Sequence, residues 1–271
     1  MKIPFFDRGP RVALIRLQGM IAARADPLGG GLSAAGVAPL IERAFALRRL
    51  QAVFIVLNSP GGSPVQSSLI AQAIRRQAEA KKIPVIAVAE DAAASGGYWV
   101  ACAADEIICD PASILGSIGV ISAGFGFHEA IARLGVERRL RTAGSEKSFL
   151  DPFRPERAED AARLEDLLGR LHEEFRAWVR ARRGAALKAP EDTLFTGRFW
   201  TGREAVALGL ADGLGDAESE ARRRFGEDVT IIPVGRRRRP FPWRLLPGLE
   251  DAAASFSHAL EERAAWARLG L

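Results

Sequence analysis

The sequence predicts an α/β protein in which a parallel sheet is covered by helices. Three apolar segments, residues 53–57, 84–89 and 106–109, have the length and composition of strands that are buried on both faces. Helical patterns separate these segments along the chain. A β-α-β-α-β order of this kind indicates parallel strands joined by crossover helices.

The remaining elements follow from caps and periodicity. Ser33 is suited to cap a helix in which apolar residues recur at helical spacing. The expected elements are, in order, strand 12–17, helix 33–49, strand 53–57, helix 64–80, strand 84–89, a short helix after Ser95, strand 106–109, helix 157–183, strand 229–234 and helix 249–269.

The composition is that of a globular protein. The 271 residues are enough for one large or two small domains, and 48% of them are hydrophobic. The net charge of +5 permits contact with an anionic surface but requires none, so we expect no nucleic-acid partner. Cys102 and Cys109 are too few for a disulfide scaffold and lack zinc-site spacing, so we expect reduced thiols and no metal.

Neither a signal peptide nor a membrane span is expected. The N-terminus has no apolar stretch of signal-peptide length, and no segment approaches the ~18 apolar residues of a membrane span. We therefore expect a cytoplasmic protein whose contact with a membrane, if any, is peripheral at the inner membrane surface.

Ser95 is the one serine in the run Ala-Ala-Ala-Ser-Gly-Gly-Tyr-Trp at 92–99. It follows a buried strand, so we expect it at the carboxyl edge of the sheet, where open α/β folds bind their ligands. Two roles fit this serine: the N-cap of the short helix, or a nucleophile whose neighbour Gly96 offers a backbone amide.

Gly61 lies in the motif Asn-Ser-Pro-Gly-Gly at 58–62, between a strand and a helix. Glycine lets the backbone approach a ligand closely, and amides near a helix N-terminus are suited to bind a negatively charged oxygen. A simple strand-to-helix turn is the alternative.

A serine nucleophile needs a base, and two side chains are candidates. Lys147 lies among small and polar residues, whereas most lysines of this chain lie on charged faces. A lysine acts as a base when burial lowers its pKa. An exposed loop lysine is the alternative. Among the histidines, only His128 lies near the right region, because His172 lies in a charged helix and His258 in the tail.

The ordered motifs resemble the signal peptide peptidase A family of serine peptidases (family S49), which shares the fold of the Clp protease and the crotonases. The matching segments are Asn-Ser-Pro-Gly-Gly at 58–62, Ala-Ser-Gly-Gly-Tyr-Trp at 94–99, Gly-Ser-Ile-Gly-Val at 116–120, the lysine segment 143–152 and the stretch 201–215. Each motif is common, but the ordered set over residues 11–235 is specific.

The resemblance implies a role for each matching residue. Ser95 corresponds to the nucleophile and Lys147 to the general base of a Ser-Lys dyad. Gly61 and Gly96 correspond to the residues whose amides form the oxyanion hole, and Ser117 to a serine that orients the lysine amine. Without a cofactor, these groups would hydrolyse peptides, remnant signal peptides included, through an acyl-enzyme.

The resemblance also implies a peptidase domain over residues 1–235 and a homo-oligomeric ring, in which serine and lysine come from the same or from neighbouring protomers. Residues 236–271 then form a basic, amphipathic C-terminal helical tail. The tail suits either packing within the oligomer or a peripheral contact with an anionic membrane. Relatives often carry an N-terminal membrane anchor, and we expect none in this protein.

Three other functions compete with the Ser-Lys peptidase. The first is a Clp-like Ser-His peptidase that uses His128. The second is a catalytically inactive, membrane-associated scaffold of the same fold. The third is a crotonase-type acyl-CoA enzyme, which gives the Ser95 and Lys147 segments no role.

Overall fold

The computed structural model describes residues 9–23, 31–144, 146–235, 259–260 and 262–271. The chain divides into two compact units, one made of residues 1–118 and 176–271 and the other of residues 119–175. No helix within the described ranges is both long and apolar enough to cross a bilayer.

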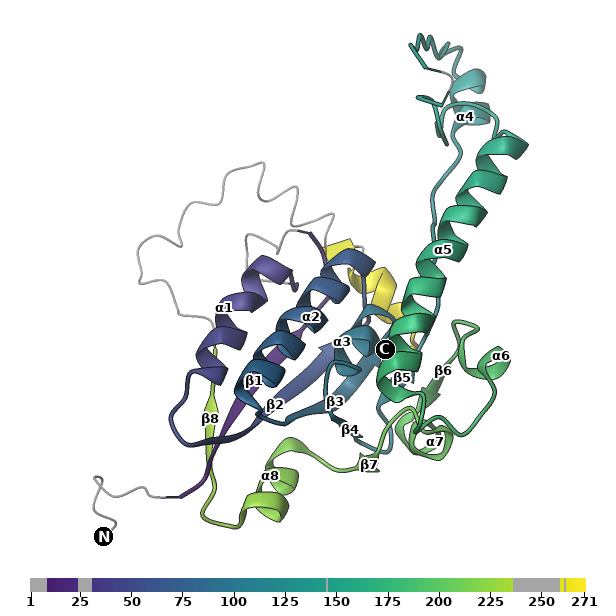
Figure 1. Ribbon diagram of the computed structural model, residues 1–271. Coiled ribbons are helices and arrows are strands. Elements are labelled where there is room, and N and C mark those ends of the chain that lie inside the picture. The colour runs from purple at the N-terminus through teal and green to yellow at the C-terminus, as the bar shows by residue number, and fades with distance from the viewer. Residues whose placement is uncertain (1–8, 24–30, 145, 236–258, 261) are drawn as a thin grey trace, which may run out of the picture. The chain divides into compact units, whose positions relative to one another are not determined.

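The larger unit is built on an eight-stranded sheet with the strand order β6-β5-β3-β2-β1-β8, in which β4 also pairs with β3, and β7 with β4 (Figure 1). Every pairing is parallel except that of β5 with β6. The strands are β1 (Arg11–Gln18), β2 (Leu50–Ser59), β3 (Val85–Ala94), β4 (Glu106–Cys109), β5 (Ile114–Gly116), β6 (Phe199–Thr201), β7 (Gly213–Leu214) and β8 (Thr230–Pro233).

Helices cover both faces of this sheet, which is why its central strands are apolar throughout. In β2, every residue except Gln51 is buried. Helices α1 (Ala34–Phe45) and α2 (Pro64–Lys81) lie side by side over one face (Figure 1). On the other face, Phe54 and Val88 pack with Ala221 of α8 (Ala217–Phe225) in one apolar cluster.

Strand β3 has two partners on the side away from β2. Its first half, Ile86 to Ala89, pairs with β4, and its last residues, Ala92 to Ala94, pair with β5. Between these halves the register with β2 shifts, since Leu57 opposes Ala89 but Ser59 opposes Ala93. Such a bulge bends a strand and redirects the residues beyond it, and here those residues lead directly to Ser95.

Most of the expected elements are confirmed. Helix α1 begins after its cap, Ser33, whose side chain accepts a hydrogen bond from the Gly36 amide. The long charged helix is α5 (Ala158–Arg183), and the last expected strand is β8, at the sheet edge beside β1. Of the expected C-terminal helix, residues 259–260 and 262–267 are helical, whereas 236–258 and 261 lie outside the described residues.

Three strands were not expected, and β3 is longer than its apolar core. Strands β5, β6 and β7 contain only two or three residues each, too few for a periodic pattern to show. Strand β3 continues five residues past Ala89 because its end pairs with β5, a contact distant along the chain. The remaining helices are α3 (Gly96–Ala101), α4 (His128–Arg133), α6 (Glu191–Leu194) and α7 (Gly202–Leu208).

Candidate active site

Ser95 forms the sharp turn between β3 and α3. Its backbone has φ +51° and ψ −120°, a conformation that costs a residue with a side chain roughly 1–3 kcal/mol. Two backbone hydrogen bonds hold this turn: the Ser95 amide donates to the Gly116 carbonyl at 2.8 Å, and the Ser95 carbonyl accepts from the Trp99 amide at 3.0 Å. A strained serine between a strand and a helix presents its hydroxyl in the manner of a nucleophile elbow.

The hydroxyl of Ser95 does not cap the helix that follows it. Ser95 occupies the N-cap position of α3, yet its side chain makes no capping hydrogen bond. The helix-cap interpretation therefore fails for the side chain, and the half-buried hydroxyl is available for other chemistry.

Two glycines crowd this serine. A Cβ on Gly61, whose φ is +106°, would lie 2.7 Å from Ser95 Cβ and 2.8 Å from the Gly96 nitrogen. A Cβ on Gly96 would lie 2.4 Å from Oγ of the buried Ser67. The motif containing Gly61 thus packs directly against Ser95, and neither Gly61 nor Gly96 has room for a side chain.

The amides of these glycines differ in their present bonding. Gly96 is the first residue of α3, so its N–H has no acceptor within the helix. The Gly61 N–H donates to Ser59 Oγ at 3.2 Å, a long bond that an incoming oxygen would have to replace. The exposed Gly62 is a further candidate donor, since its nitrogen lies 3.2 Å from the place of a Gly96 Cβ.

Ser117 lies on the neighbouring strand end. Ala94 and Gly116 are register partners, so Ser95 and Ser117 are the next residues on two paired strands. Ser117 also has a positive φ, +52°, and its amide donates to the Arg198 carbonyl at 2.8 Å. The structure thus gathers four of the five predicted residues: Ser95, Gly61, Gly96 and Ser117.

Lys147, the fifth, belongs to the smaller unit, residues 119–175. It is exposed, and its amide donates to the Gly144 carbonyl at 3.3 Å within a turn. His128 begins α4 in the same unit, where it lines a cavity of about 560 Å³ formed by residues 122–128 and 148–164. Neither candidate base belongs to the unit that carries Ser95.

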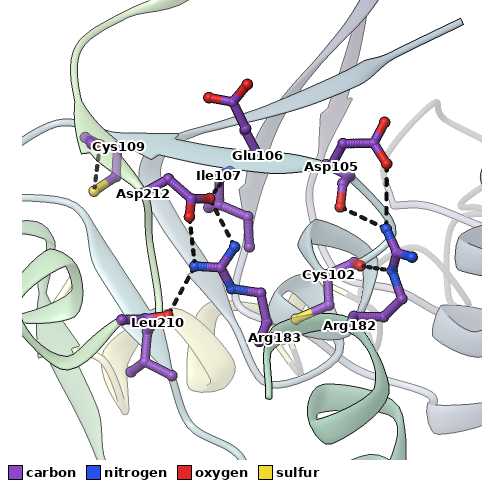
Figure 2. Close-up of polar contacts among 12 residues, drawn as sticks. Cys102, Asp105, Glu106, Ile107, Cys109, Arg182, Arg183, Leu210 and Asp212 are labelled. Carbon is purple, nitrogen blue, oxygen red and sulfur yellow. Dashed lines mark hydrogen bonds and ion pairs between the residues drawn. The ribbon is translucent and has the colours of Figure 1, made fainter. Parts of the chain in front are cut away.

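Helix α3 is fixed from behind by the C-terminal half of α5. Trp178 Nε1 donates to the Trp99 carbonyl at 2.9 Å, and Arg182 donates to the carbonyls of Cys102 and Ala104, both at 3.0 Å. The adjacent Arg183 forms an ion pair with Asp212 at 2.8 Å (Figure 2). The bonds from Trp178 and Arg182 give partners to carbonyls in and just after the last turn of α3.

The two thiols near this network are not candidate nucleophiles. Burial raises the pKa of Cys102 to about 12 and the pKa of Cys109 to about 11, so both remain protonated at neutral pH. Burial likewise raises the pKa of Tyr98, whose hydroxyl donates to the Leu210 carbonyl at 2.8 Å.

The fold resembles that of solved proteases. A lysine-to-alanine mutant of the 1510-N membrane-bound stomatin-specific protease, in complex with a substrate peptide, has a TM-score of 0.52 and 16% sequence identity. The likeness covers 93% of this chain and 99% of that one. A serine-to-alanine mutant gives the same TM-score over 84% of this chain. This confirms the expected Clp protease/crotonase-like fold, and the class of this protein is that of α/β proteins with this fold.

Within that class, the chain belongs to peptidase family S49. The family model matches residues 77–230, more than half of the chain. The matched range contains Ser95, Gly96, Ser117 and Lys147, whereas Gly61 precedes it.

Relatives carry different names. "Na(+)/H(+) antiporter NhaA" of Brucella abortus is 45% identical over 96% of this chain, and "Serine protease SPPA, chloroplastic" of Arabidopsis thaliana is 30% identical over 93%. The chain spans only 37% and 38% of these two proteins. "Probable protease SohB" of Haemophilus influenzae is 28% identical over 84% of this chain and 65% of its own length. The antiporter name thus belongs to a protein that lies mostly outside the match.

Proposed function

We propose that this chain is a serine endopeptidase in which Ser95 and Lys147 form a catalytic dyad. The observation that carries the proposal is the strained, uncapped Ser95 at the β3–α3 turn, with Gly61 packed against it. A residue held in such a conformation is typical of active sites, where geometry outweighs local stability. Membership of peptidase family S49 supports the same reaction.

The proposed reaction proceeds through an acyl-enzyme. Lys147 Nζ accepts the proton of the Ser95 hydroxyl while Oγ attacks the scissile carbonyl carbon. The amides of Gly96 and Gly61 bind the oxyanion, and Ser117 orients the lysine amine. The lysine then gives its proton to the leaving amine, and it later activates the water that releases the second peptide from Ser95.

The proposed substrates are extended peptides with small or apolar side chains near the cut, such as remnant signal peptides. One relative, from Enterococcus faecium, is named "Putative signal peptide peptidase SppA", and it is 30% identical over 68% of this chain. The solved structure named above holds a substrate peptide.

Peptide hydrolysis by three proteins tests the dyad: the wild type, Ser95→Ala and Lys147→Ala. We expect both variants to lose activity by at least about a thousandfold, because nucleophile and base act as a unit. A fluorophosphonate probe should label the wild type and not Ser95→Ala. His128→Ala is the control: full activity is expected, and a loss there with an active Lys147→Ala would support the Ser-His alternative instead. A wild type that neither hydrolyses peptides nor takes the label would support the inactive scaffold.

The smaller unit supports a homo-oligomer as the active form. Among the described residues 119–175, Phe175 is the one buried apolar side chain. Exposed large side chains are instead concentrated there, namely Ile121, Phe125, Phe127, Leu134, Val136, Phe153 and Leu167. An apolar surface of this kind marks an interaction site, and Lys147, exposed in the single chain, needs burial to act as a base.

Mixing two inactive variants tests whether a neighbouring protomer supplies the lysine. If serine and lysine are shared between protomers, Ser95→Ala and Lys147→Ala proteins regain activity after subunit exchange. Fluorescence energy transfer between labelled subunits verifies that exchange has occurred. Verified exchange without recovered activity would assign both residues to one chain.

A further inference from the structure

Asn58 lies at the contact between the two segments that carry the proposed active site, the glycine arm (residues 58–61) and the serine arm (residues 92–95). It precedes Gly61 by three residues on the β2 side, and Ala92 precedes Ser95 by three residues on the β3 side. Asn58 Oδ1 accepts a hydrogen bond from the Ala92 amide at 3.3 Å. One side chain therefore links the serine arm to the glycine arm.

The link occurs where backbone pairing is interrupted. Leu57 and Ser59 oppose Ala89 and Ala93, so a step of two residues on β2 faces a step of four on β3. The bulged residues lose part of their ladder hydrogen bonding. Asn58 supplies a side-chain acceptor to the Ala92 amide, directly before β3 changes its partner to β5.

The other end of the carboxamide is held as well. Asn58 Nδ2 donates to Asp91 Oδ2 at 2.5 Å. The backbone of Asn58 is held too, since its main-chain carbonyl accepts from the Gly19 amide at 2.9 Å. Asp91 is exposed, whereas Asn58 is 8% exposed. The Ala92 amide can only donate and the Asp91 carboxylate only accept, so the position requires a short side chain with both functions.

We propose that Asn58 is a positioning residue for catalysis, whose carboxamide, anchored by Asp91, sets the spacing between Ser95 and the Gly61 loop. The inference rests on the proposed function of Ser95. Asn58 itself is assigned no contact with substrate. It acts by holding the nucleophile and the oxyanion donors in one geometry, and a displacement near 1 Å lowers rates by roughly a hundredfold.

An Asn58→Asp substitution tests the link with almost no change in shape. The introduced carboxylate still accepts from Ala92 but faces Asp91 with a like charge. We expect kcat to fall roughly tenfold to a hundredfold at neutral pH with little change in KM. The kcat ratio of variant to wild type should rise as pH falls, because one proton shared by two adjacent carboxylates restores a hydrogen bond.

The charges around Asp91 determine the control. Asp91 lines a cavity of about 930 Å³ on the α8 side of the sheet. The charged side chains that share this cavity are Arg16, Glu90, Asp110, Asp216 and Glu218. Two double variants, Asn58→Asp/Asp91→Asn and Asn58→Asp/Glu218→Gln, have the same net charge, but only the first restores a donor facing an acceptor. We expect the first to recover kcat and the second to remain impaired.

Asp91 variants keep the test informative if Asn58→Asp does not fold. Asp91→Ala leaves Asn58 without its anchor at an exposed position, and we expect kcat to fall roughly threefold to tenfold. Asp91→Asn should be close to wild type, because its amide oxygen can accept from Asn58 Nδ2. Equal kcat for these two variants would overturn the inference.

Other outcomes separate the inference from the proposed function. Full activity of a folded Asn58→Asp, or equal rescue by Glu218→Gln and Asp91→Asn, overturns the positioning role alone. Ser95-dependent hydrolysis in the wild type must be present in the same assay. Its absence overturns the proposed function, and the positioning role with it.

Discussion

At the residue scale, Ser95 combines backbone strain with an unused hydroxyl. The positive φ that shapes the β3–α3 turn is one that glycine adopts without cost, yet a serine occupies it. At Gly61 the requirement is the reverse: only glycine fits, because a Cβ there would collide with Ser95. The close contact with Ser95 accounts for the glycine at position 61, and the proposed function, rather than stability, accounts for the serine.

The strain predicts that the Ser95→Gly variant has a larger free energy of unfolding than the Ser95→Ala variant. Glycine relieves the backbone strain, and part of the gain is offset by its greater freedom in the unfolded chain, which leaves a difference of about 1 kcal/mol. Urea denaturation of the two inactive variants measures it.

The same pair of substitutions at Ser68 provides the control. Ser68 lies inside α2, where glycine is less favourable than alanine by about 1 kcal/mol, so the order of the variants should reverse. A less stable glycine variant at both positions would refute strain at Ser95.

At the element scale, α5 is tied to the body of the larger unit by side chains near its C-terminus. Trp178 donates to a carbonyl of α3. Arg182 donates to the Cys102 carbonyl at the end of α3, and Arg183 binds Asp212 (Figure 2). On the same part of α5, Arg180 forms two hydrogen bonds of 2.6 Å with Glu191, the first residue of α6. Polar contacts of charged side chains thus fix this end of the helix together with the buried apolar side chains of Phe175 and Val179.

The Glu191 pair predicts a pH-dependent stability difference. The Arg180 hydrogen bonds, with help from Arg176, lower the pKa of Glu191 from 4.5 to about 2. A carboxyl group whose pKa is lowered by folding stabilises the folded state above its unfolded pKa, and the contribution is lost as pH falls toward 2.

Glu191→Gln should therefore melt at a lower temperature than the wild type at pH 7, and the difference should shrink progressively below about pH 4.5. Thermal melts from pH 7 to pH 2.5 measure it. Glu218→Gln, which removes an exposed helical ion pair with Arg222, is the control and should show a smaller difference at pH 7. A Glu191→Gln difference independent of pH would contradict the assignment.

At the scale of the whole molecule, the two units differ in what they bury. The larger unit has a continuous core on both faces of its sheet, whereas the described part of the smaller unit buries one apolar side chain, Phe175. Phe125 and Leu134 are 81% and 78% exposed. If Ser95 and Lys147 come from neighbouring protomers, a second copy of the chain is the partner that this exposed apolar surface requires.

Replacing both side chains, Phe125→Ser with Leu134→Ser, should lower the oligomeric state. Sedimentation velocity measures the mass, and circular dichroism verifies an intact larger unit. Peptidase activity should fall with the oligomer, because Lys147 belongs to the affected unit. Arg133→Ser, at a side chain that is 82% exposed, is the matched control and should change neither mass nor activity. An inactive variant of unchanged mass would count against an interface at these residues.

Local signals alone identified most of the central elements and the residues at their ends. The apolar content of β2, the cap at Ser33 and the glycines around Ser95 each reflect a requirement within a few residues of sequence, so the order of elements and the candidates Ser95, Gly61 and Gly96 could be predicted. Ser117 was a candidate only through the family resemblance. The resemblance to peptidase family S49 then assigned chemistry to them.

Only the tertiary structure decided how β3 is used. Strand β3 pairs with β4 along its first half and with β5 at its end, and its register with β2 shifts between these two parts. These pairings join segments distant along the chain, and β5 is too short to give a pattern of its own. The side-chain link from Asn58 to Asp91 is likewise a contact across strands. The sequence by itself determined which residues lie at the ends of the strands. Pairing between segments distant along the chain determined which strand ends lie next to one another in the folded protein.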